Sequence, residues 1–291
     1  MYTFNSWSFA LFSANLHRYL PKLDWPQHET VYINWKDHHR KKPLDELLNK
    51  REIDVQVLES FRDPAIITLF HLGDHLVWPV LLAQNGIRFN VILDRVVYLD
   101  AKGLFDQLLI KLGAYGHAPE LLFSDDRALL LKIRSRIADG QHLLCFADGA
   151  SGSETVKKDE RLPIRFLEGT LWLKKGIPFI SHLFDMPVIS LLPQGIGDIE
   201  QLQFHKTILP VSYEDREVYL LRCLQQLYGS LEKKIKNEPH LWECWGYLHQ
   251  NGMLGKIVDN QIFNDISATV QVVWDDKMVT FDRLNYTVRR E

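Results

Sequence analysis

Residues 65–84, AIITLFHLGDHLVWPVLLAQ, indicate the architecture around which the rest of the chain is organised. The first six residues are mostly apolar and rich in β-branched side chains, as in a short buried strand. A polar segment follows at residues 71–75, and the eight apolar residues 76–83 then have the character of a buried helix. Gly73 lies in the polar segment, where glycine lets the backbone approach a ligand closely. The stretch therefore predicts a strand-to-helix junction, where α/β proteins place ligands and catalytic groups.

The flanking segments extend this pattern into an α/β fold. Further strands are predicted at residues 88–93 and 142–147, and helices at residues 44–58, 101–112 and 125–140. In the second half we expect helices at residues 170–175 and 217–235 and strands at residues 179–180 and 188–192. The alternation of strands and helices predicts a mixed sheet flanked by helices.

The last forty residues change character. Val270, Val272 and Trp274 fall at every second position, a turn follows at residues 275–277, and a second strand returns at residues 278–281. We therefore expect residues 1–250 to form the main domain and residues 251–291 to form a C-terminal β-hairpin extension.

The first twenty residues are predicted to form an amphipathic helix. Phe4, Trp7, Leu11, Leu16 and Leu20 fall near one face. Two interpretations stay open, a helix packed on the protein core and an interfacial helix at a membrane surface. The segment lacks the basic start of a signal peptide, and no stretch reaches the roughly 18 apolar residues of a membrane span.

Composition limits the function classes. With 291 residues, 46% of them hydrophobic, the chain can bury a sizeable core. The 34 Lys and Arg residues against 37 Asp and Glu give a net charge of −3, which argues against a dedicated nucleic-acid binder. Cys145, Cys223 and Cys244 form no C-x-x-C pair, so neither a zinc site nor a disulfide framework is expected. This cysteine usage fits a reducing compartment and a cytoplasmic location.

His71 is the first candidate for catalysis, because imidazole can take up a proton near neutral pH. Such a base needs a carboxylate or carbonyl to orient it. Asp74 follows three residues later, close enough in a helical turn to share a face with His71. Asp148 ends the strand that begins at His142, so it can lie beside His71 across the sheet edge.

Other chemistries have weaker signals. His71 and His75 have the H-x-x-x-H spacing of a helical zinc site, but no glutamate follows His71 as in H-E-x-x-H, and no metal is expected. Residues 149–153, GASGS, resemble a serine-hydrolase elbow only superficially, because the spacing is G-x-S-G. The basic cluster KDHHRKK at residues 36–42 indicates either a solvated loop or a docking patch for an acidic carrier protein or a phosphate-bearing cofactor.

Three blocks, in this order, resemble the lysophospholipid acyltransferase superfamily, nearest its lipid A late acyltransferase and phosphatidylinositol mannoside acyltransferase branch. They are FHLGDHLVWP at residues 70–79, CFADGASGSETVKKDERLPIRFLEG at residues 145–169 and LKKGIPFISHLFDMPVISLLP at residues 173–193. The tract with Pro239, Trp242 and Trp245 resembles the family's C-terminal Pro-Trp-Trp segment. The likeness covers roughly residues 1–250 and leaves the final hairpin outside.

The resemblance implies a glycerolipid acyltransferase-like fold and transfer of a fatty acyl group to a hydroxyl or amine. The donor would be a thioester of acyl carrier protein or coenzyme A, with no further cofactor. His71 would deprotonate the acceptor, a lipid, peptide or metabolite, without an acyl-enzyme. Contact with the inner face of a membrane stays open. The expected substrate-binding residues are Gly73, His75, Gly149, Arg165, Phe166 and Gly169.

The sequence departs from the family at one position. The family has an acid five residues after its histidine, where this chain has Leu76. The carboxylate is therefore expected from Asp148, which resembles an acid at the end of the later strand in the mannoside acyltransferases, with Asp74 as the substitute. The membrane span at the N-terminus of the lipid A enzymes is also missing. Two other functions stay open, a non-catalytic acyl-chain or carrier-binding relative and a metallohydrolase using His71 and His75.

Overall fold

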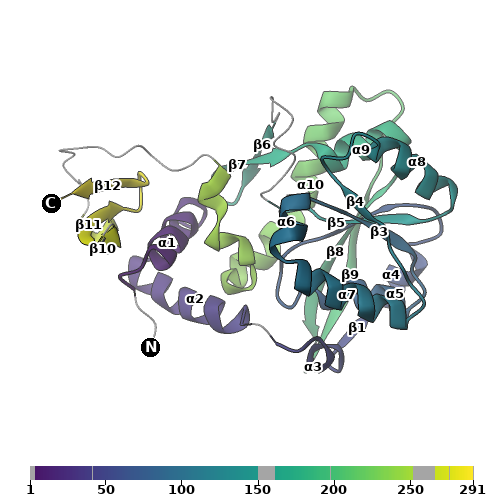
Figure 1. The fold of residues 1–291 in the computed structure, drawn as a ribbon. Coiled ribbons are helices and arrows are strands. Elements are labelled where there is room, and N and C mark those ends of the chain that lie inside the picture. Colours follow the sequence, from purple (N-terminus) through teal and green to yellow (C-terminus); the bar gives the residue numbers. More distant parts are fainter. Residues whose placement is uncertain are drawn as a thin grey trace. The chain divides into compact units, whose positions relative to one another are not determined.

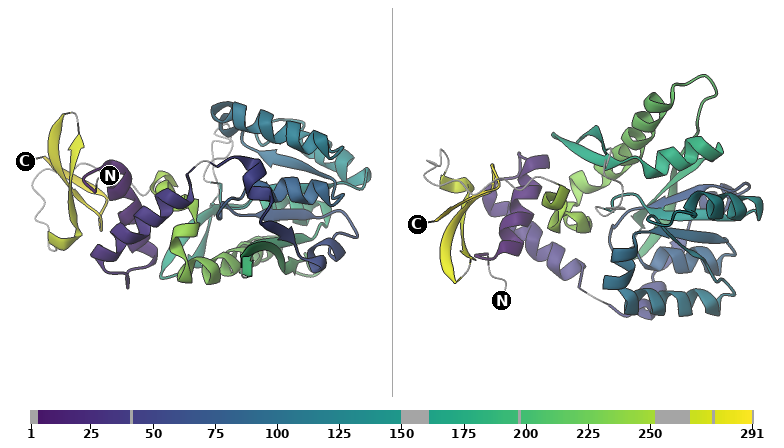
Figure 2. Two further views of the ribbon diagram at one scale, coloured as in Figure 1. Left: turned by 90° about the horizontal axis from the view of Figure 1, so that it is seen from below. Right: turned by 45° about the horizontal axis from the view of Figure 1, so that its top comes forward.

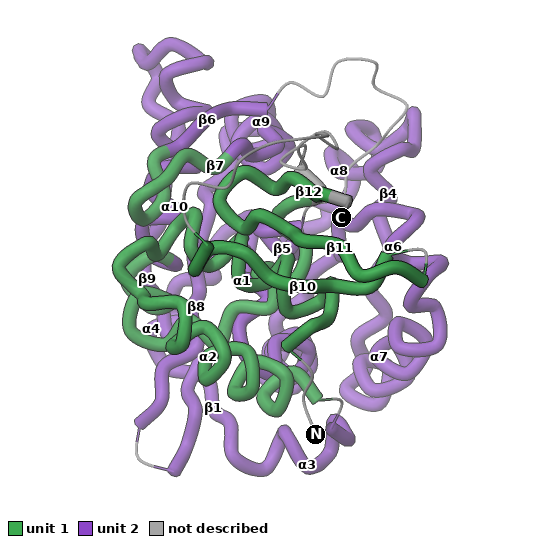
Figure 3. Tube along the Cα trace, turned by 90° about the vertical axis from the view of Figure 1, so that its left-hand side faces the viewer, with its two compact units in different colours: residues 1–40, 165–171, 232–291 green, residues 41–164, 172–231 purple. Residues whose placement is uncertain are grey.

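The structure is a computed structural model that describes residues 4–40, 42–149, 161–196, 198–251, 266–274 and 276–290. The chain divides into two compact units (Figure 3). Unit 1 comprises Met1–Arg40, Arg165–Leu171 and Glu232–Glu291, and unit 2 comprises Lys41–Ile164 and Trp172–Leu231. This division does not follow the expected boundary at residue 250, because the N-terminal helices group with the C-terminal strands.

Unit 2 contains a mixed sheet whose seven described strands run in the order β1-β9-β8-β2-β5-β3-β4 (Figure 1). Their bounds are β1 Arg51–Ile53, β2 Ile66–Leu69, β3 Phe89–Leu93, β4 Leu121–Phe123, β5 His142–Phe146, β8 Val188–Ile196 and β9 Ile199–Ile208. The central strand β2 pairs in parallel with β5 and β8, whereas β9 is antiparallel to β8. The predicted α/β fold with a mixed sheet is confirmed.

Helices cover both faces of this sheet. Those of unit 2 are α3 Leu44–Leu48, α4 Val55–Glu59, α5 Val77–Gln84, α6 Arg95–Asp100, α7 Lys102–Ala114, α8 Leu129–Ala138, α9 Gly176–Phe184 and α10 Arg216–Asn237, which continues into unit 1. Helices α5 and α7 lie on one face and α10 on the other (Figure 2). The core beneath α5 joins Trp78, Val80 and Leu82 to Ile67 of β2, all at most 1% exposed. Each fully buried aliphatic side chain contributes roughly 1.5–3 kcal/mol, so α5 is held by packing.

Several predictions of helices and strands are wrong. Of residues 170–175, expected as a helix, all but the last lie in strand β7 (Gly169–Lys174), which pairs with β6 (Arg161–Phe166). Leu171 and Leu173 are buried there while Trp172 is exposed, which is the two-residue period of a strand. Residues 179–180, expected as a strand, lie in α9, because two apolar residues cannot define a period.

The predicted helix at residues 44–58 is interrupted. It divides into α3, β1 and α4, because Arg51–Ile53 pairs in parallel with residues 200–202 of β9. The Asp54 side chain then accepts the backbone N–H of Gln56 and caps α4. Neither β9 nor β4 was predicted. Strand β9 pairs with β8, which directly precedes it, and with the distant β1, whereas β4 pairs with β3 across helices α6 and α7.

Unit 1 combines the N-terminal helices with the C-terminal strands. Its elements are α1 Trp7–Tyr19, α2 Trp25–His38, short 3₁₀ helices at Pro239–Leu241, Glu243–Gly246, Leu248–Asn251 and Ile266–Ala268, and strands β10 Thr269–Trp274, β11 Lys277–Asp282 and β12 Thr287–Arg290. Phe12 and Leu16 of α1 are fully buried, which favours the packed alternative for the N-terminal helix. Within the described ranges, no helix is both long and apolar enough to cross a membrane.

The C-terminal hairpin is confirmed for β10 and β11, but the sheet has a third strand, β12, that was not predicted. The sheet also packs on α1 and is not a separate extension. Val272 and Phe281 share a buried cluster with Ala10 and Ala14, and the Trp7 indole donates to the Val273 carbonyl at 2.8 Å. The hydrophobic face of these strands is thus covered by the first helix of the chain.

His142 makes the stability of the sheet depend on pH. Its buried Nδ1 accepts the backbone N–H of Ala65 at 3.1 Å, which requires a neutral ring, and burial lowers its pKa to about 4. Because the unfolded chain takes up this proton more readily, stability is lost as the pH falls from about 6.5 toward 4. The variant His142→Asn keeps a hydrogen-bond acceptor but does not titrate. Between about pH 7 and 5 we expect its free energy of unfolding to fall by about 2 kcal/mol less than that of the wild type.

Chemical denaturation at the two pH values measures this effect. The exposed His205 provides a control, because His205→Asn should leave the pH dependence as it is in the wild type. An equally steep loss in His142→Asn and the wild type would contradict the assignment.

Candidate functional site

The parallel pairing of β2 and β5 determines which residues meet at the carboxyl edge of the sheet. Ile66 pairs with Leu143 and Leu69 with Phe146. The Ala147 N–H continues the ladder by donating to the Leu69 carbonyl at 2.8 Å. The same offset of 77 residues brings His71 beside Asp148 just past the strand ends.

His71 and Asp148 are joined through side chain and backbone. His71 Nδ1 lies 2.7 Å from Asp148 Oδ1, and the His71 backbone N–H donates to Asp148 Oδ2 at 3.0 Å. An ionised carboxylate only accepts hydrogen bonds, so Nδ1 carries the proton and the neutral ring has its lone pair on Nε2. That is the tautomer in which Nε2 can take a proton from a substrate.

Burial differs sharply between the two side chains. The Asp148 side chain is 1% exposed and the His71 side chain 25% exposed. A buried carboxylate needs donors, and the two N–H groups of His71 supply them and favour its charged form. The ionised Asp148 in turn stabilises a positive charge on His71 once the ring is protonated. A buried carboxylate thus orients an imidazole whose ring is partly exposed, which is an arrangement that a general base requires.

Two rings fix the plane of the imidazole. The Phe146 ring lies 4.7 Å from the His71 ring at an interplanar angle of 32°, and the His75 ring meets it edge-on, also at 4.7 Å. Phe146 is the last residue of β5 and was not identified from the sequence. A strand-terminal aromatic residue two positions before a candidate acid is the signal that could have indicated it.

Asp74 lies in a different ion pair. Its carboxylate contacts the Arg51 guanidinium and lies 3.6 Å from Lys42 Nζ, and Arg51 Nε also binds Glu200 at 3.1 Å. The expectation that Asp74 shares a helical turn with His71 is wrong, because both residues precede α5, which begins at Val77. Asp74 instead ties the loop at residues 71–75 to β1. Nothing in the sequence around Arg51 indicated this contact.

The loop also holds Gly73 and His75. Gly73 has a φ of +56°, which favours glycine, and its carbonyl lies 3.3 Å from His75 Nδ1. His71 and His75 both precede the helix, so the helical spacing of a zinc site does not apply to them. Gly149 follows Asp148 and is exposed, whereas residues 150–153 of the serine-containing loop lie outside the described residues.

Arg165, Phe166 and Gly169, expected to bind substrate, belong to unit 1. Arg165 is exposed, and the buried Phe166 ring packs against Tyr19 and Trp242 at 5.8 and 5.4 Å. A Cβ at Gly169 would lie 3.0 Å from the Tyr19 ring and 3.3 Å from the Arg18 carbonyl. The contacts of Phe166 and Gly169 are thus those of core packing within unit 1.

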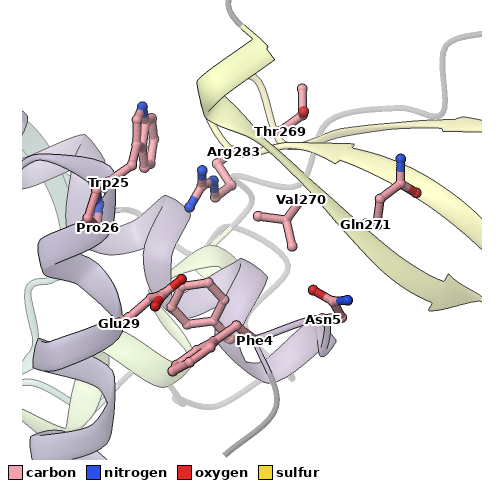
Figure 4. Close-up of a pocket in the computed structure, with 10 residues that line it drawn as sticks. Phe4, Asn5, Trp25, Pro26, Glu29, Thr269, Val270, Gln271 and Arg283 are labelled. Atoms are coloured by element: carbon pink, nitrogen blue, oxygen red, sulfur yellow. The ribbon is translucent and has the colours of Figure 1, made fainter.

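Unit 1 also contains an open cavity of about 380 Å³ (Figure 4). It is lined by Phe9, Trp25, Val270 and other residues of α1, α2 and β10. The buried Arg283 stacks on Trp25 at 3.9 Å and donates to Ser13 and to the Ala268 carbonyl. Among the described residues, those that line this cavity include neither histidine nor cysteine. We therefore take the His71–Asp148 pair in unit 2 as the candidate site.

No family model matches the chain, and no curated protein matches it significantly.

The closeness of Gly169 to the Tyr19 ring predicts that a larger residue at position 169 destabilises the protein. We expect Gly169→Ala to lower the free energy of unfolding by about 1–3 kcal/mol, because the added methyl group must displace Tyr19 or the backbone. Gly103 is the matched control, since a Cβ there has nothing within 4 Å and lies in helix α7. Thermal unfolding of the two variants measures the difference, and equal midpoints would contradict the packing role.

The Arg51–Asp74 ion pair predicts a second effect on stability. We expect Asp74→Asn to destabilise unit 2 by roughly 2 kcal/mol, because the contact is largely desolvated and Arg51 would lose a charged partner. Asp45→Asn is the control, because its pair with Lys111 is exposed and worth about 0–1 kcal/mol. Urea denaturation of both variants tests this, and a loss no larger in Asp74→Asn than in Asp45→Asn would count against it.

Proposed function

We propose that this protein is an acyltransferase that moves a fatty acyl group from a thioester to a hydroxyl or amine. The observation that supports it is the His71–Asp148 contact of 2.7 Å at the carboxyl ends of adjacent parallel strands. In α/β sheets this is the edge at which ligands bind. The resemblance of residues 70–79 and 145–169 to lysophospholipid acyltransferases supports the choice of acyl transfer among base-catalysed reactions.

In the proposed reaction His71 Nε2 takes the proton of the acceptor hydroxyl or amine as it attacks the thioester carbonyl. Asp148 holds the ring in the required tautomer and stabilises the imidazolium. The tetrahedral intermediate collapses with cleavage of the carbon–sulfur bond, and the imidazolium returns its proton to the leaving thiolate. The products are the acylated acceptor and the free thiol of coenzyme A or acyl carrier protein.

Direct transfer without an acyl-enzyme agrees with the state of two of the cysteines. Burial raises the pKa of Cys145 to about 12, and burial also raises that of Cys223 to about 12. A thiol at such a pKa is protonated near neutral pH and is a poor nucleophile. Neither of these two thiols is expected to form an acyl-enzyme, and in the proposed mechanism the substrate's own hydroxyl or amine is the attacking group.

The test is release of thiol from acyl-coenzyme A and acyl carrier protein thioesters, offered with a panel of hydroxyl and amine acceptors. We expect acceptor-dependent thiol release that falls by about 10²–10⁴-fold in His71→Ala and in Asp148→Ala. Asp74→Asn should retain most of the rate per folded molecule, since Asp74 binds Arg51.

The outcomes separate the proposal from its main alternative. Tight binding of acyl thioester without turnover by the wild type would favour a non-catalytic binding protein, for which Leu76 in place of the family's acid is the motivating observation. Turnover that persists at the wild-type rate in His71→Ala would reject His71 as the base.

A further inference from the structure

The residue before Asp148 is held from two sides. Ala147 donates its N–H to the Leu69 carbonyl at 2.8 Å, and its carbonyl accepts the Tyr228 hydroxyl at 3.0 Å. The first bond continues the β2–β5 ladder. The second comes from helix α10, which covers the opposite face of the sheet from α5 (Figure 2). The peptide that leads into Asp148 is therefore fixed by both the sheet and a helix.

Tyr228 is itself well anchored. Its side chain is almost completely buried, at 1% exposure, and its ring packs edge-on against Phe70 at 5.5 Å. Phe70 immediately precedes His71, so one side chain touches both strand-end segments of the candidate site. The ring contacts the segment that carries the base, and the hydroxyl binds the segment that carries the acid.

The position of His71 and Asp148 beyond the strand ends explains why a bond to Ala147 is needed. Asp148 orients His71 only while the carboxylate stays within hydrogen-bond range of Nδ1, and the two residues lie just past the last paired positions of β2 and β5. Beyond those positions the ladder no longer limits the separation of the two segments. A bond to the carbonyl next to Asp148 replaces that limit on the β5 side.

We propose that Tyr228 is a positioning residue that keeps Asp148 against His71 through the Ala147 carbonyl. It acts on catalysis through Asp148, by fixing the imidazole tautomer. The kinetic part of this inference rests on the proposed function, whereas the tautomer part concerns the His71–Asp148 pair alone.

The test compares Tyr228→Phe with Tyr219→Phe. Both tyrosines lie on α10 and are buried, but the Tyr219 hydroxyl binds Ser181 instead of the site. Removing the hydroxyl keeps the ring and its packing, so both variants should fold, which thermal unfolding checks. We expect only Tyr228→Phe to lower kcat, by roughly tenfold, with KM within about twofold of the wild type.

The readout that a merely structural role would not move is the tautomer of His71. Nitrogen chemical shifts of ¹⁵N-histidine-labelled protein at about pH 8 report which ring nitrogen carries the proton, and the His71 signals are assigned by their loss in His71→Gln. The wild type and Tyr219→Phe should show the Nδ1–H form. Tyr228→Phe should show a mixture of Nδ1–H and Nε2–H forms.

A Tyr228→Phe spectrum identical to the wild type would overturn the proposal, whatever its effect on stability. Absence of acyl transfer in the wild type would reject the proposed function alone, because the tautomer comparison needs no turnover. If Tyr228→Phe changed the tautomer of His71 but kept the wild-type kcat, Tyr228 would still position the His71–Asp148 pair, and the claim that this positioning affects catalysis would be rejected.

Discussion

The parallel hydrogen bonding of β2 to β5 is the constraint on which the candidate site depends. Strands that run in parallel end at the same edge of a sheet, and their register fixes which residues lie opposite each other there. In this chain the register pairs Leu69 with Phe146 and so brings His71 beside Asp148. A shift of one residue would place Ala147 or Gly149 beside the imidazole, and neither has a carboxylate. The buried apolar side chains of both strands, such as Ile67 and Leu144, hold the register in place.

Electrostatics then distinguishes two carboxylates that look alike in the sequence. Asp148 is almost fully buried and is compensated by the two N–H groups of His71, so its charge acts on the imidazole. Asp74 is only a few residues from His71, yet its charge is neutralised by Arg51, with Lys42 near by. A carboxylate already paired with a guanidinium gains little from an imidazole. The division of roles therefore follows from what surrounds each acid and not from its distance along the chain.

The structure brings residues 71 and 148, from two of the blocks that resemble acyltransferases, into contact, whereas residues 165–169 lie in the other unit. Arg165, Phe166 and Gly169 fall in unit 1, where the last two pack against Tyr19. The strand errors have two causes. Residues 121–123 form a strand by pairing with β3 across two helices, and local periodicity carries no record of that partner. Residues 170–174 and 199–208 instead pair with β6 and β8, the strands directly before them, so the local pattern was misinterpreted there.

By itself the sequence determined the strand-to-helix junction at residues 65–84 and the α/β class, and it proposed Asp148 or Asp74 as the partner of His71. The junction and the class follow from composition and period, which are local properties. Only the tertiary structure decided between Asp74 and Asp148, brought Arg51, Phe146 and Tyr228 to the site, and grouped the first helix with the last three strands. Each of these depends on contacts between segments far apart in the chain, whose free energy is gained only when apolar surface is buried between them.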